Sequence, residues 1–269
     1  MTATGGSESE RQQQTDWNRQ TAGNWQRFAP HRARLTSLLR DLARERTGPR
    51  LAVLGAGNTN DLDLPQLLET FAEITLVDWD REAVQRGVAR QVGPQESRLR
   101  IAAAVDLSEA AADLRVPAAA GWLPAEPFEV VASIGLLSQL MLAACRRIER
   151  PADLAARARQ VRQRHLECIT RWTAKEGDAL VTCEIVSSET LPELASAAVV
   201  APLLGPALEA GNFFTGLHPA AVAASFREGT PAGGFRRQEW LSPWRWDLGP
   251  RVYAVAALRL LEKQPPDAP

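Results

Sequence analysis

The sequence predicts an α/β fold, with a doubly wound, mainly parallel sheet of seven strands, a C-terminal antiparallel hairpin and N-terminal helices. Short apolar runs alternate with helical segments, which is typical of a parallel sheet covered on both faces. A glycine-rich turn directly follows the first apolar run. Near the C-terminus a turn, and no helix, joins two strand-like runs, and this pattern predicts the hairpin.

Length and composition indicate one large domain. The chain has 269 residues, of which 45% are hydrophobic, and this is enough to bury a full core. A formal net charge of -1 provides no bulk attraction to phosphates, so we expect no sequence-independent binding of nucleic acid. The polar N-terminus lacks an export signal, and no apolar run is long enough to span a membrane. We therefore expect a soluble cytoplasmic protein without a membrane partner.

The organisation of the chain follows from its composition and periodicity. Residues 1–14 have almost nothing to bury, so we expect a disordered tail. Residues 15–48 form a predicted helical cap, because leucines recur at the three-and-four spacing of one helix face between positions 35 and 42. The remainder divides into a main domain, an insertion within it and a terminal tail, at 49–262, about 188–217 and 263–269.

The elements of the main domain can be placed in order. Apolar runs with flanking turn residues predict the strands, and apolar residues at helical spacing predict the helices. The predicted strands are 50–54, 74–77, 99–105, 127–133, 179–186, 234–241 and 251–260. The predicted helices are 81–90, 139–174 with a break before Pro151, and 219–226.

Two features at strand ends indicate a nucleoside site. Gly55 and Gly57 follow the first strand, where glycines allow the backbone to approach a ligand closely. Asp78 ends the second strand, and its carboxylate can accept both hydroxyls of an adenosine ribose. Since ligands of doubly wound sheets bind at the carboxyl ends of the strands, we expect these residues to lie together.

The residues after the glycines discriminate between nucleosides. Asn60 stands where a dinucleotide fingerprint has its third glycine, and no Walker-type lysine follows. Asp61 adds a negative charge that would repel phosphates. A ligand with an ammonium group, such as S-adenosylmethionine, tolerates that charge better.

With these motifs the sequence resembles the class I S-adenosylmethionine-dependent methyltransferases, which have a Rossmann-like fold. The resemblance covers roughly residues 50–260 and includes Val105-Asp106 after the third strand and the terminal hairpin. It implies that Gly55 and Gly57 line the methionine part of the cofactor. It also implies further cofactor-binding residues: Asn58 and Asp61 in the glycine loop, Asp78 at the ribose, Trp79 and Asp106 at the adenine, and Ile134 and Gly135 beside the sulfonium.

Several alternatives stay open. The glycines could form an ordinary tight turn, and Asp78 could be a surface residue at a strand end. Trp79 could be ordinary hydrophobic cover, and Asp106 could be a helix N-cap. At the level of function the alternatives are an NAD-dependent oxidoreductase and a non-catalytic S-adenosylmethionine-binding protein.

The reaction itself requires no conspicuous motif. Methyl transfer is an in-line displacement from an activated leaving group, so positioning can supply much of the acceleration. If a base is used, His218 is the first candidate, with a helix-start residue as the alternative reading. We expect His165 to be a solvated helix position, and Glu184 is a possible substrate-facing group. No metal-ligand spacing is visible, and the acceptor is predicted to be a small molecule or a side chain.

Two aromatic and basic groups lie outside these motifs. His31 and Arg32 precede the first leucine-rich helix, where Arg32 could reach the cofactor carboxylate or simply enter the helix. Tryptophans at 240, 244 and 246 cluster near the hairpin turn, and either core packing or a dimer surface would explain them.

Overall fold

A computed structural model describes residues 4–93, 96–103, 126–146, 150–230 and 233–265. The strands are β1 (Arg50–Leu54), β2 (Glu73–Asp78), β3 (Leu99–Ala103), β4 (Phe128–Ser133), β5 (Thr173–Ser187), β6 (Gly234–Trp240), β7 (Trp244–Asp247) and β8 (Val252–Gln264). They form one sheet in the order β3-β2-β1-β4-β5-β8-β6, and β7 also pairs with β8. Strands β1 to β5 pair in parallel, whereas β8 runs antiparallel to its neighbours. The predicted α/β class and the antiparallel C-terminal strands are therefore confirmed.

The C-terminal hairpin differs in detail from the prediction. Within the described residues the sheet has eight strands and not seven, because the region before β8 forms two strands. β6 pairs with the end of β8 and β7 with its beginning. Trp240 pairs with Leu258 in the middle of β8, whereas Trp244 and Trp246 of the unexpected strand β7 pair with Val255 and Tyr253 near its beginning.

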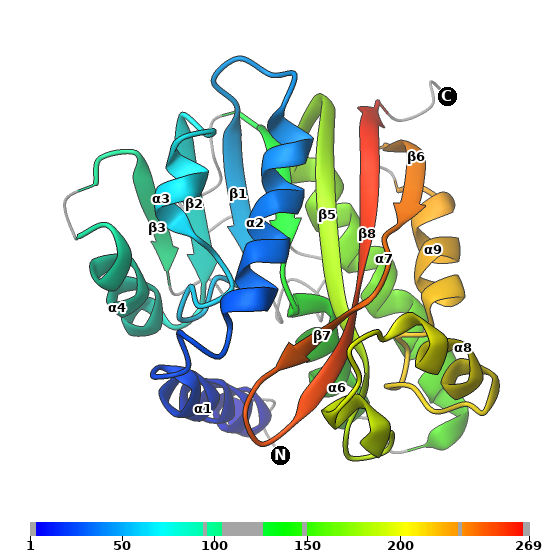
Figure 1. Ribbon diagram of the computed structural model, residues 1–269. Helices are drawn as coiled ribbons and strands as arrows, with labels where there is room; N and C mark the ends of the chain where they lie inside the picture. The colour runs from blue at the N-terminus through cyan, green and yellow to red at the C-terminus, as the bar shows by residue number, and fades with distance from the viewer. Residues whose placement is uncertain (1–3, 94–95, 104–125, 147–149, 231–232, 266–269) are drawn as a thin grey trace.

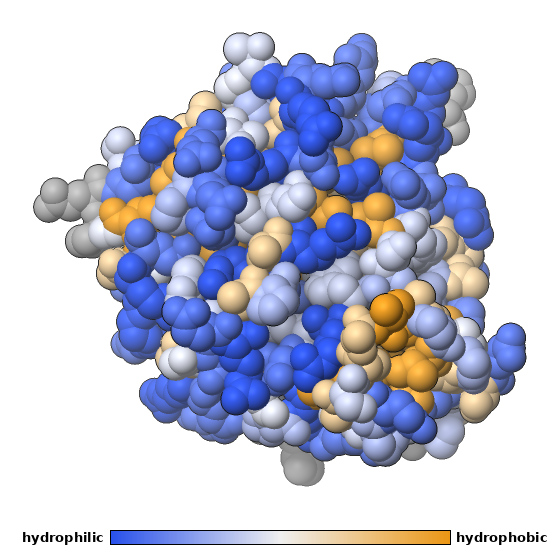
Figure 2. Space-filling view, viewed as in Figure 1, coloured by the Kyte–Doolittle hydropathy of each residue, from blue (hydrophilic) through white to orange (hydrophobic). Residues whose placement is uncertain are grey.

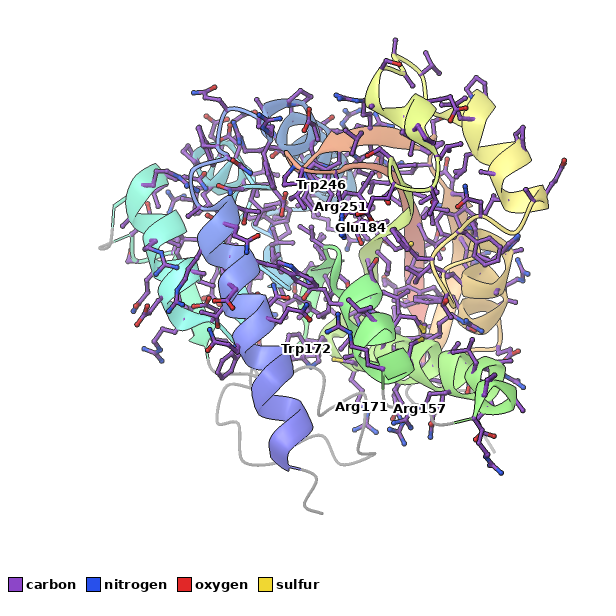
Figure 3. All side chains as sticks on the ribbon, turned by 90° about the horizontal axis from the view of Figure 1, so that it is seen from below. Arg157, Arg171, Trp172, Glu184, Trp246 and Arg251 are labelled. Atoms are coloured by element: carbon purple, nitrogen blue, oxygen red, sulfur yellow. The ribbon has the colours of Figure 1, made fainter. Side chains whose placement is uncertain are left out.

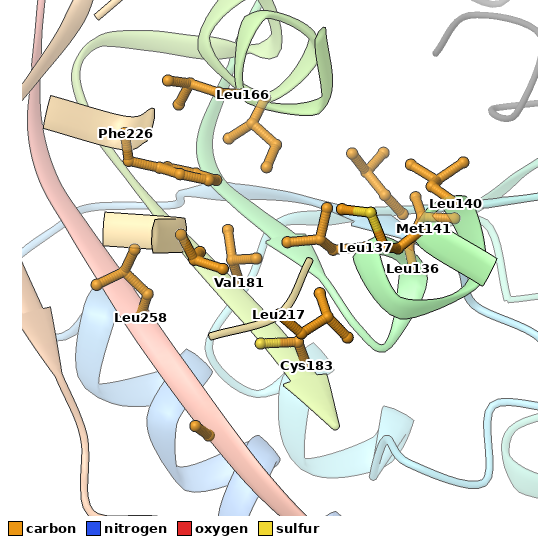
Figure 4. Packing of buried hydrophobic residues seen from close by; sticks show 14 of the residues in the cluster. Leu136, Leu137, Leu140, Met141, Leu166, Val181, Cys183, Leu217, Phe226 and Leu258 are labelled. Atoms are coloured by element: carbon orange, nitrogen blue, oxygen red, sulfur yellow. The ribbon is translucent and has the colours of Figure 1, made fainter. Parts of the chain in front are cut away.

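Helices cover both faces of the sheet (Figure 1). Alternate residues of β1 supply the two cores: Leu51 and Val53 pack on one face, Ala52 and Leu54 on the other. Figure 4 shows the second core, where Phe226 and Leu217 meet the central strands. The first face is covered by α2 (Ala29–Ala43), α3 (Leu64–Leu68) and α4 (Arg81–Gln91), the second by α6 (Leu136–Arg146), α7 (Leu154–Trp172) and α9 (Pro219–Arg227).

The carboxyl ends of the parallel strands share the lower edge of the sheet in Figure 1. Three other segments lie along this edge: α1 (Thr4–Thr21), β7, and the insertion containing η2 (Pro192–Ala195) and α8 (Ala201–Glu209). Figure 2 shows hydrophobic residues gathered over the insertion, where Val199 is 65% exposed. The elements therefore place the glycine turn, Asp78 and the insertion at one edge.

The N-terminal segment corrects one prediction. Residues 4–14 belong to α1, where the composition predicts disorder. Side-chain hydrogen bonds compensate for the lack of apolar burial: Gln12 donates to Asp16 within the helix, and Arg146 of α6 donates to Gln13. Composition alone predicts disorder because it registers hydrophobic burial and not such polar contacts with the rest of the fold.

His165 also departs from expectation. Its side chain is buried, with 3% exposure, and its Nε2 lies 2.8 Å from the hydroxyl of Ser133 at the end of β4. Burial lowers the pKa of His165 to about 4, so the ring is neutral at pH 7. The pair joins α7 to the sheet. Most of the residues around His165 in the sequence are polar, so the sequence does not indicate that this face of the helix is buried.

Candidate functional site

The glycine turn joins the ends of three strands. Gly55 has a φ of 81° and Gly57 a φ of 45°, conformations that favour glycine. Gly55 N donates to Val77 O at 3.0 Å, which fixes the turn on β2. A Cβ on Gly55 would lie 3.0 Å from Ile134 O and 3.3 Å from the Cβ of Leu136, so a side chain there would press on the segment after β4. The turn therefore exposes bare backbone at the carboxyl ends of β1, β2 and β4.

Asp78 lies beside this turn, as the sequence predicts. Its Oδ2 accepts from Gly57 N at 2.8 Å, and its Oδ1 accepts from Asp80 N at 2.9 Å. Burial raises the pKa of Asp78 to about 6, although the backbone N–H groups of Asp80 and Gly57 oppose the shift. A carboxylate oxygen has two lone pairs, so each oxygen can still accept a ligand hydroxyl.

The second half of the loop is fastened to α1 and α4. The side-chain nitrogen of Asn58 donates to Asn18 O and to Thr21 Oγ1, and that of Asn60 donates to Thr21 O. Arg90 of α4 donates to Asn58 O at 3.0 Å and to Asn60 Oδ1 at 2.8 Å. Asn58 was predicted to bind cofactor, but its side chain holds α1 against the loop. Its role in binding stays a prediction.

Gly87 was missed by sequence reasoning. A Cβ on this residue of α4 would lie 2.3 Å from both Asn58 O and Thr59 Oγ1, so only glycine fits. Thr59 itself has a φ of 52°, which is unusual for a β-branched residue. Gln91 donates to its carbonyl and hydroxyl oxygens at 3.0 and 2.9 Å and stabilises this conformation. The available signal was a glycine inside a helix, where it costs stability without a packing reason.

Asp61 faces α2 and not solvent. Its Oδ1 lies 3.4 Å from His31 Nε2, and His31 Nδ1 accepts from Trp244 Nε1 at 2.9 Å. Burial, then the charge of Arg32, lowers the pKa of His31 to about 3, so the ring is neutral. Burial, then the charge of Glu184, raises the pKa of Asp61 to about 7 against the effect of Arg32. Asp61 Oδ1 has no hydrogen-bond partner among the described residues, so it is free to accept one.

Arg32 supports the loop. It donates to Trp25 O at 2.8 Å and to Asn60 O at 3.1 Å, and its guanidinium carbon lies 3.5 Å from the Trp25 ring centroid. These contacts agree with its reading as a structural helix-entry residue.

Ile134 and Gly135 follow β4 directly beside the glycine turn. Ile134 N donates to Leu54 O at 3.1 Å, and Gly135 N donates to Thr182 Oγ1 at 3.0 Å. Gly135 has a φ of 61°, and a Cβ there would lie 3.0 Å from Glu184 Oε1. Glu184 therefore lies at the segment that the sequence predicts to face the reacting sulfonium.

The remaining predicted residues have different outcomes. Trp79 is half-buried at the end of β2, next to Asp78. Asp106 lies outside the described residues. His218 is the N-cap of α9: its Nδ1 accepts from Ala220 N at 3.1 Å, and its ring meets Phe213 edge-on. These contacts match the helix-start alternative, and a role as a general base stays a prediction.

Two kinds of feature are absent from the described residues. No group of three or more His, Cys, Asp or Glu residues there could hold a metal ion. No described helix is long and apolar enough to cross a membrane.

Comparisons with known proteins add only distant likenesses. The chain matches no protein-family model and no curated protein. N-methyltransferase NodS from Bradyrhizobium japonicum WM9 is 12% identical, with a TM-score of 0.46 over 87% of this chain and 98% of that one. YcgJ from Bacillus subtilis is 12% identical, with a TM-score of 0.47 over 85% and 98% of the two chains. DesVI from Streptomyces venezuelae is 11% identical, with a TM-score of 0.44 over 86% and 91%. Likenesses this distant transfer no function, which has to follow from the site's own residues.

Proposed function

We propose that the chain is an S-adenosylmethionine-dependent methyltransferase acting on a small-molecule acceptor. The observation that carries the proposal is the pairing of Asp78 with the backbone of Gly57 at adjoining strand ends. A bare turn beside a strand-end carboxylate fits a nucleoside whose ribose hydroxyls approach the free lone pairs of that carboxylate. Bound S-adenosylmethionine supplies a methyl group on a sulfonium.

The site's own residues divide the work of binding. Gly55 and Gly57 let the backbone approach the methionine part of the cofactor. Asp61 offers the cofactor ammonium its unpartnered buried oxygen, which is the observation that favours this ligand over a phosphate. Trp79 packs against the adenine in this proposal, and Asp106 accepts from its amino group. Ile134 and Gly135 line the space around the sulfonium.

The alternative of a dinucleotide-binding oxidoreductase receives less support. Asn60 occupies the third-glycine position, and its side chain donates to Thr21 O at 2.8 Å. A dinucleotide fold uses glycine at this position for close packing of helix against strand, whereas here the Asn60 side chain binds α1.

Calorimetric titration tests the proposal with S-adenosylhomocysteine and NADH as separate ligands. We expect only S-adenosylhomocysteine to bind. In Asp78→Asn its affinity should fall about 100-fold, because the amide weakens two charge-assisted hydrogen bonds. Asp41→Asn, which alters an α2 residue paired with Arg44 at 2.8 Å, is the control and should bind normally.

The pH dependence provides a second arm of the same test. Because the pKa of Asp78 is about 6, affinity for S-adenosylhomocysteine should weaken as the pH falls through that value. Heat with NADH alone, or unchanged affinity in Asp78→Asn, would contradict the proposal. Cofactor binding without turnover on any acceptor would instead indicate a non-catalytic binding protein.

A further inference from the structure

One face of the sheet beside the predicted sulfonium position carries a carboxylate and aromatic rings. Strand register explains their meeting, because Glu184 of β5 pairs with Val255 of β8, two residues from Tyr253 on the same face. Trp246 of β7 pairs with Tyr253 from the other side of β8, and their ring centroids lie 5.6 Å apart. Figure 3 shows Glu184 and Trp246 together at this edge.

The insertion contributes a third ring. Phe214 N donates to Ile185 O at 2.7 Å. Because Ile185 directly follows Glu184 in the chain, this bond anchors Phe214 near Glu184. The Phe214 ring centroid lies 6.1 Å from that of Tyr253. Glu184 lies beside Gly135, and its charge acts on Tyr253, so residues of β5, β7, β8 and the insertion gather near this end of β5.

Glu184 is buried there without a counter-ion. It is 9% exposed, and no lysine, arginine or histidine of the described residues forms an ion pair with it. The nearby arginines pair with other carboxylates: Arg251 pairs with Glu189 at 2.8 Å and also hydrogen-bonds the side chain of Tyr253, and Arg245 pairs with Asp247 at 3.2 Å. A buried carboxylate without a cation is costly, so a ligand that brings a positive charge would be favoured.

The groups near Glu184 do not compensate its charge. Asp61 Oδ1 and Trp246 Nε1 are buried and have no hydrogen-bond partner in the described part of the chain. His31 stacks on Trp246 at 4.7 Å and is neutral, so it neutralises neither carboxylate. In the proposed function the ammonium group of the cofactor pairs with Asp61. Burial raises the pKa of Glu184, so its ionised form is favoured when a cation lies beside it. In this inference the acceptor supplies that cation.

We propose that the acceptor is an arylalkyl amine that arrives as an ammonium cation, with its nitrogen bound by the Glu184 carboxylate and its carbon skeleton against Trp246 and Tyr253. This inference rests on the proposed function. Aromatic faces attract cations and pack against apolar skeletons, so rings beside a buried carboxylate suit both parts of such an amine. An alcohol or carboxylic acid would leave the Glu184 charge uncompensated.

The reaction balances with these residues. The ammonium nitrogen gives a proton to Glu184 and so exposes the lone pair that attacks. A bond forms between nitrogen and the methyl carbon while the bond between that carbon and sulfur breaks, and the electron pair stays on sulfur as S-adenosylhomocysteine. The product is a methylated ammonium ion, and the proton on Glu184 passes to solvent when the product leaves.

The test uses the full chain saturated with S-adenosylhomocysteine and two matched probes, phenethylamine and 2-phenylethanol. Calorimetry measures binding of each probe, and a separate assay with S-adenosylmethionine measures methylation. We expect wild type to prefer the amine by about 100-fold, which is the range of one charge-assisted contact. Glu184→Gln should abolish that preference and lower amine turnover by about 100-fold while S-adenosylhomocysteine affinity stays within about twofold. Glu193→Gln, an exposed change in η2 of the insertion, should leave probe binding, turnover and S-adenosylhomocysteine affinity unchanged.

The outcomes separate the two proposals. If wild type fails to bind S-adenosylhomocysteine, the proposed function is wrong. If it binds S-adenosylhomocysteine but neither binds nor methylates phenethylamine, or prefers the alcohol, the amine inference is overturned. A Glu184→Gln variant that keeps the amine preference, together with a His218→Ala variant that loses turnover, would transfer the proton-accepting role to His218. A merely structural Glu184 would weaken both probes equally and leave their ratio unchanged.

Discussion

The two halves of the site are built in opposite ways. In the proposed cofactor half, around Gly57 and Asp78, the polar groups are bonded to one another, and both oxygens of Asp78 accept backbone N–H groups. In the acceptor half, Glu184 is buried without an ion pair among the described residues, and Trp246 Nε1 has no partner there. Around Gly57 and Asp78 the polar groups are bonded before a ligand arrives, whereas Trp246 Nε1, and Asp61 Oδ1 between the two halves, are left for a ligand to satisfy.

This difference indicates where each half derives its specificity. A turn held by internal hydrogen bonds is rigid and would present one shape to the proposed cofactor. Unsatisfied buried groups penalise every ligand that cannot pair with them, so they select among acceptors. Mutations in the first half should therefore change affinity for the cofactor, and mutations in the second should change the choice of acceptor.

Gly87→Ala should produce the largest effect on stability and cofactor binding, since its side chain would push on the glycine loop from α4. The added Cβ would lie 2.3 Å from the carbonyl oxygen of Asn58, so the loop must move. We expect a loss of at least about 3 kcal/mol in unfolding free energy and about 100-fold weaker binding of S-adenosylhomocysteine. Urea unfolding and calorimetry measure the two effects.

Gly205→Ala is the matched control in α8, where no heavy atom lies within 4 Å of the added Cβ. It should stabilise the fold by about 0.5 kcal/mol, because alanine is the better helix former. Equal effects of the two substitutions would contradict the close packing assigned to Gly87.

Asp61→Asn tests the residue that lies between the two halves of the site. The pKa of Asp61 is about 7 in the fold and 3.8 ordinarily, so folding favours the protonated form. The stability from this shift is complete below pH 3.8 and is lost as the pH rises through about 7. The neutral amide avoids that loss, so Asp61→Asn should be more stable than wild type by about 2 kcal/mol at pH 8 and by less at pH 5.

Urea unfolding at both pH values, repeated with saturating S-adenosylhomocysteine, measures this effect. Bound ligand should shrink or reverse the gain, because its ammonium pairs with the wild-type carboxylate. The same gain at pH 5 and pH 8 would show that ionisation of Asp61 is not its cause.

Asn18→Ala should have the smallest effect and should act on the cofactor half alone. It removes the 3.0 Å hydrogen bond from Asn18 Nδ2 to Asp80 Oδ2 and loosens α1 from the glycine loop. We expect a loss of about 1 kcal/mol and faster proteolysis within α1. Gln20→Ala, an exposed change on the same helix, is the control. If proteolysis is equally fast in both variants, the contact with Asp80 does not hold α1 in place.

Local patterns in the sequence were enough to predict most of the fold and the contact between the glycine turn and Asp78. The apolar runs became β1, β2, β4 and β5 because a buried parallel strand needs only a short apolar stretch between turns. Gly57 and Asp78 could be paired in advance because consecutive strands of such a sheet lie side by side with their carboxyl ends together. The order of the strands along the chain is therefore enough to predict that contact.

The polar supports of the cofactor half could not be foreseen in the same way. Residues 4–14 lack the apolar content that identifies a stable helix, and α1 is held by hydrogen bonds to distant groups. His165 sits in a polar stretch of α7 although its own side chain faces the sheet. Such contacts depend on which way a single side chain points, and periodicity does not resolve that.

By itself the sequence determined the sheet, the bare turn and the carboxylate beside it, since each depends on residues close in the chain or on neighbouring parallel strands. Only the tertiary structure placed Glu184 with Trp246 and Tyr253, because the antiparallel register of β8 and the unexpected strand β7 set their positions. Residues so far apart in sequence meet through strand pairing, and no local propensity encodes which side chains then share a face.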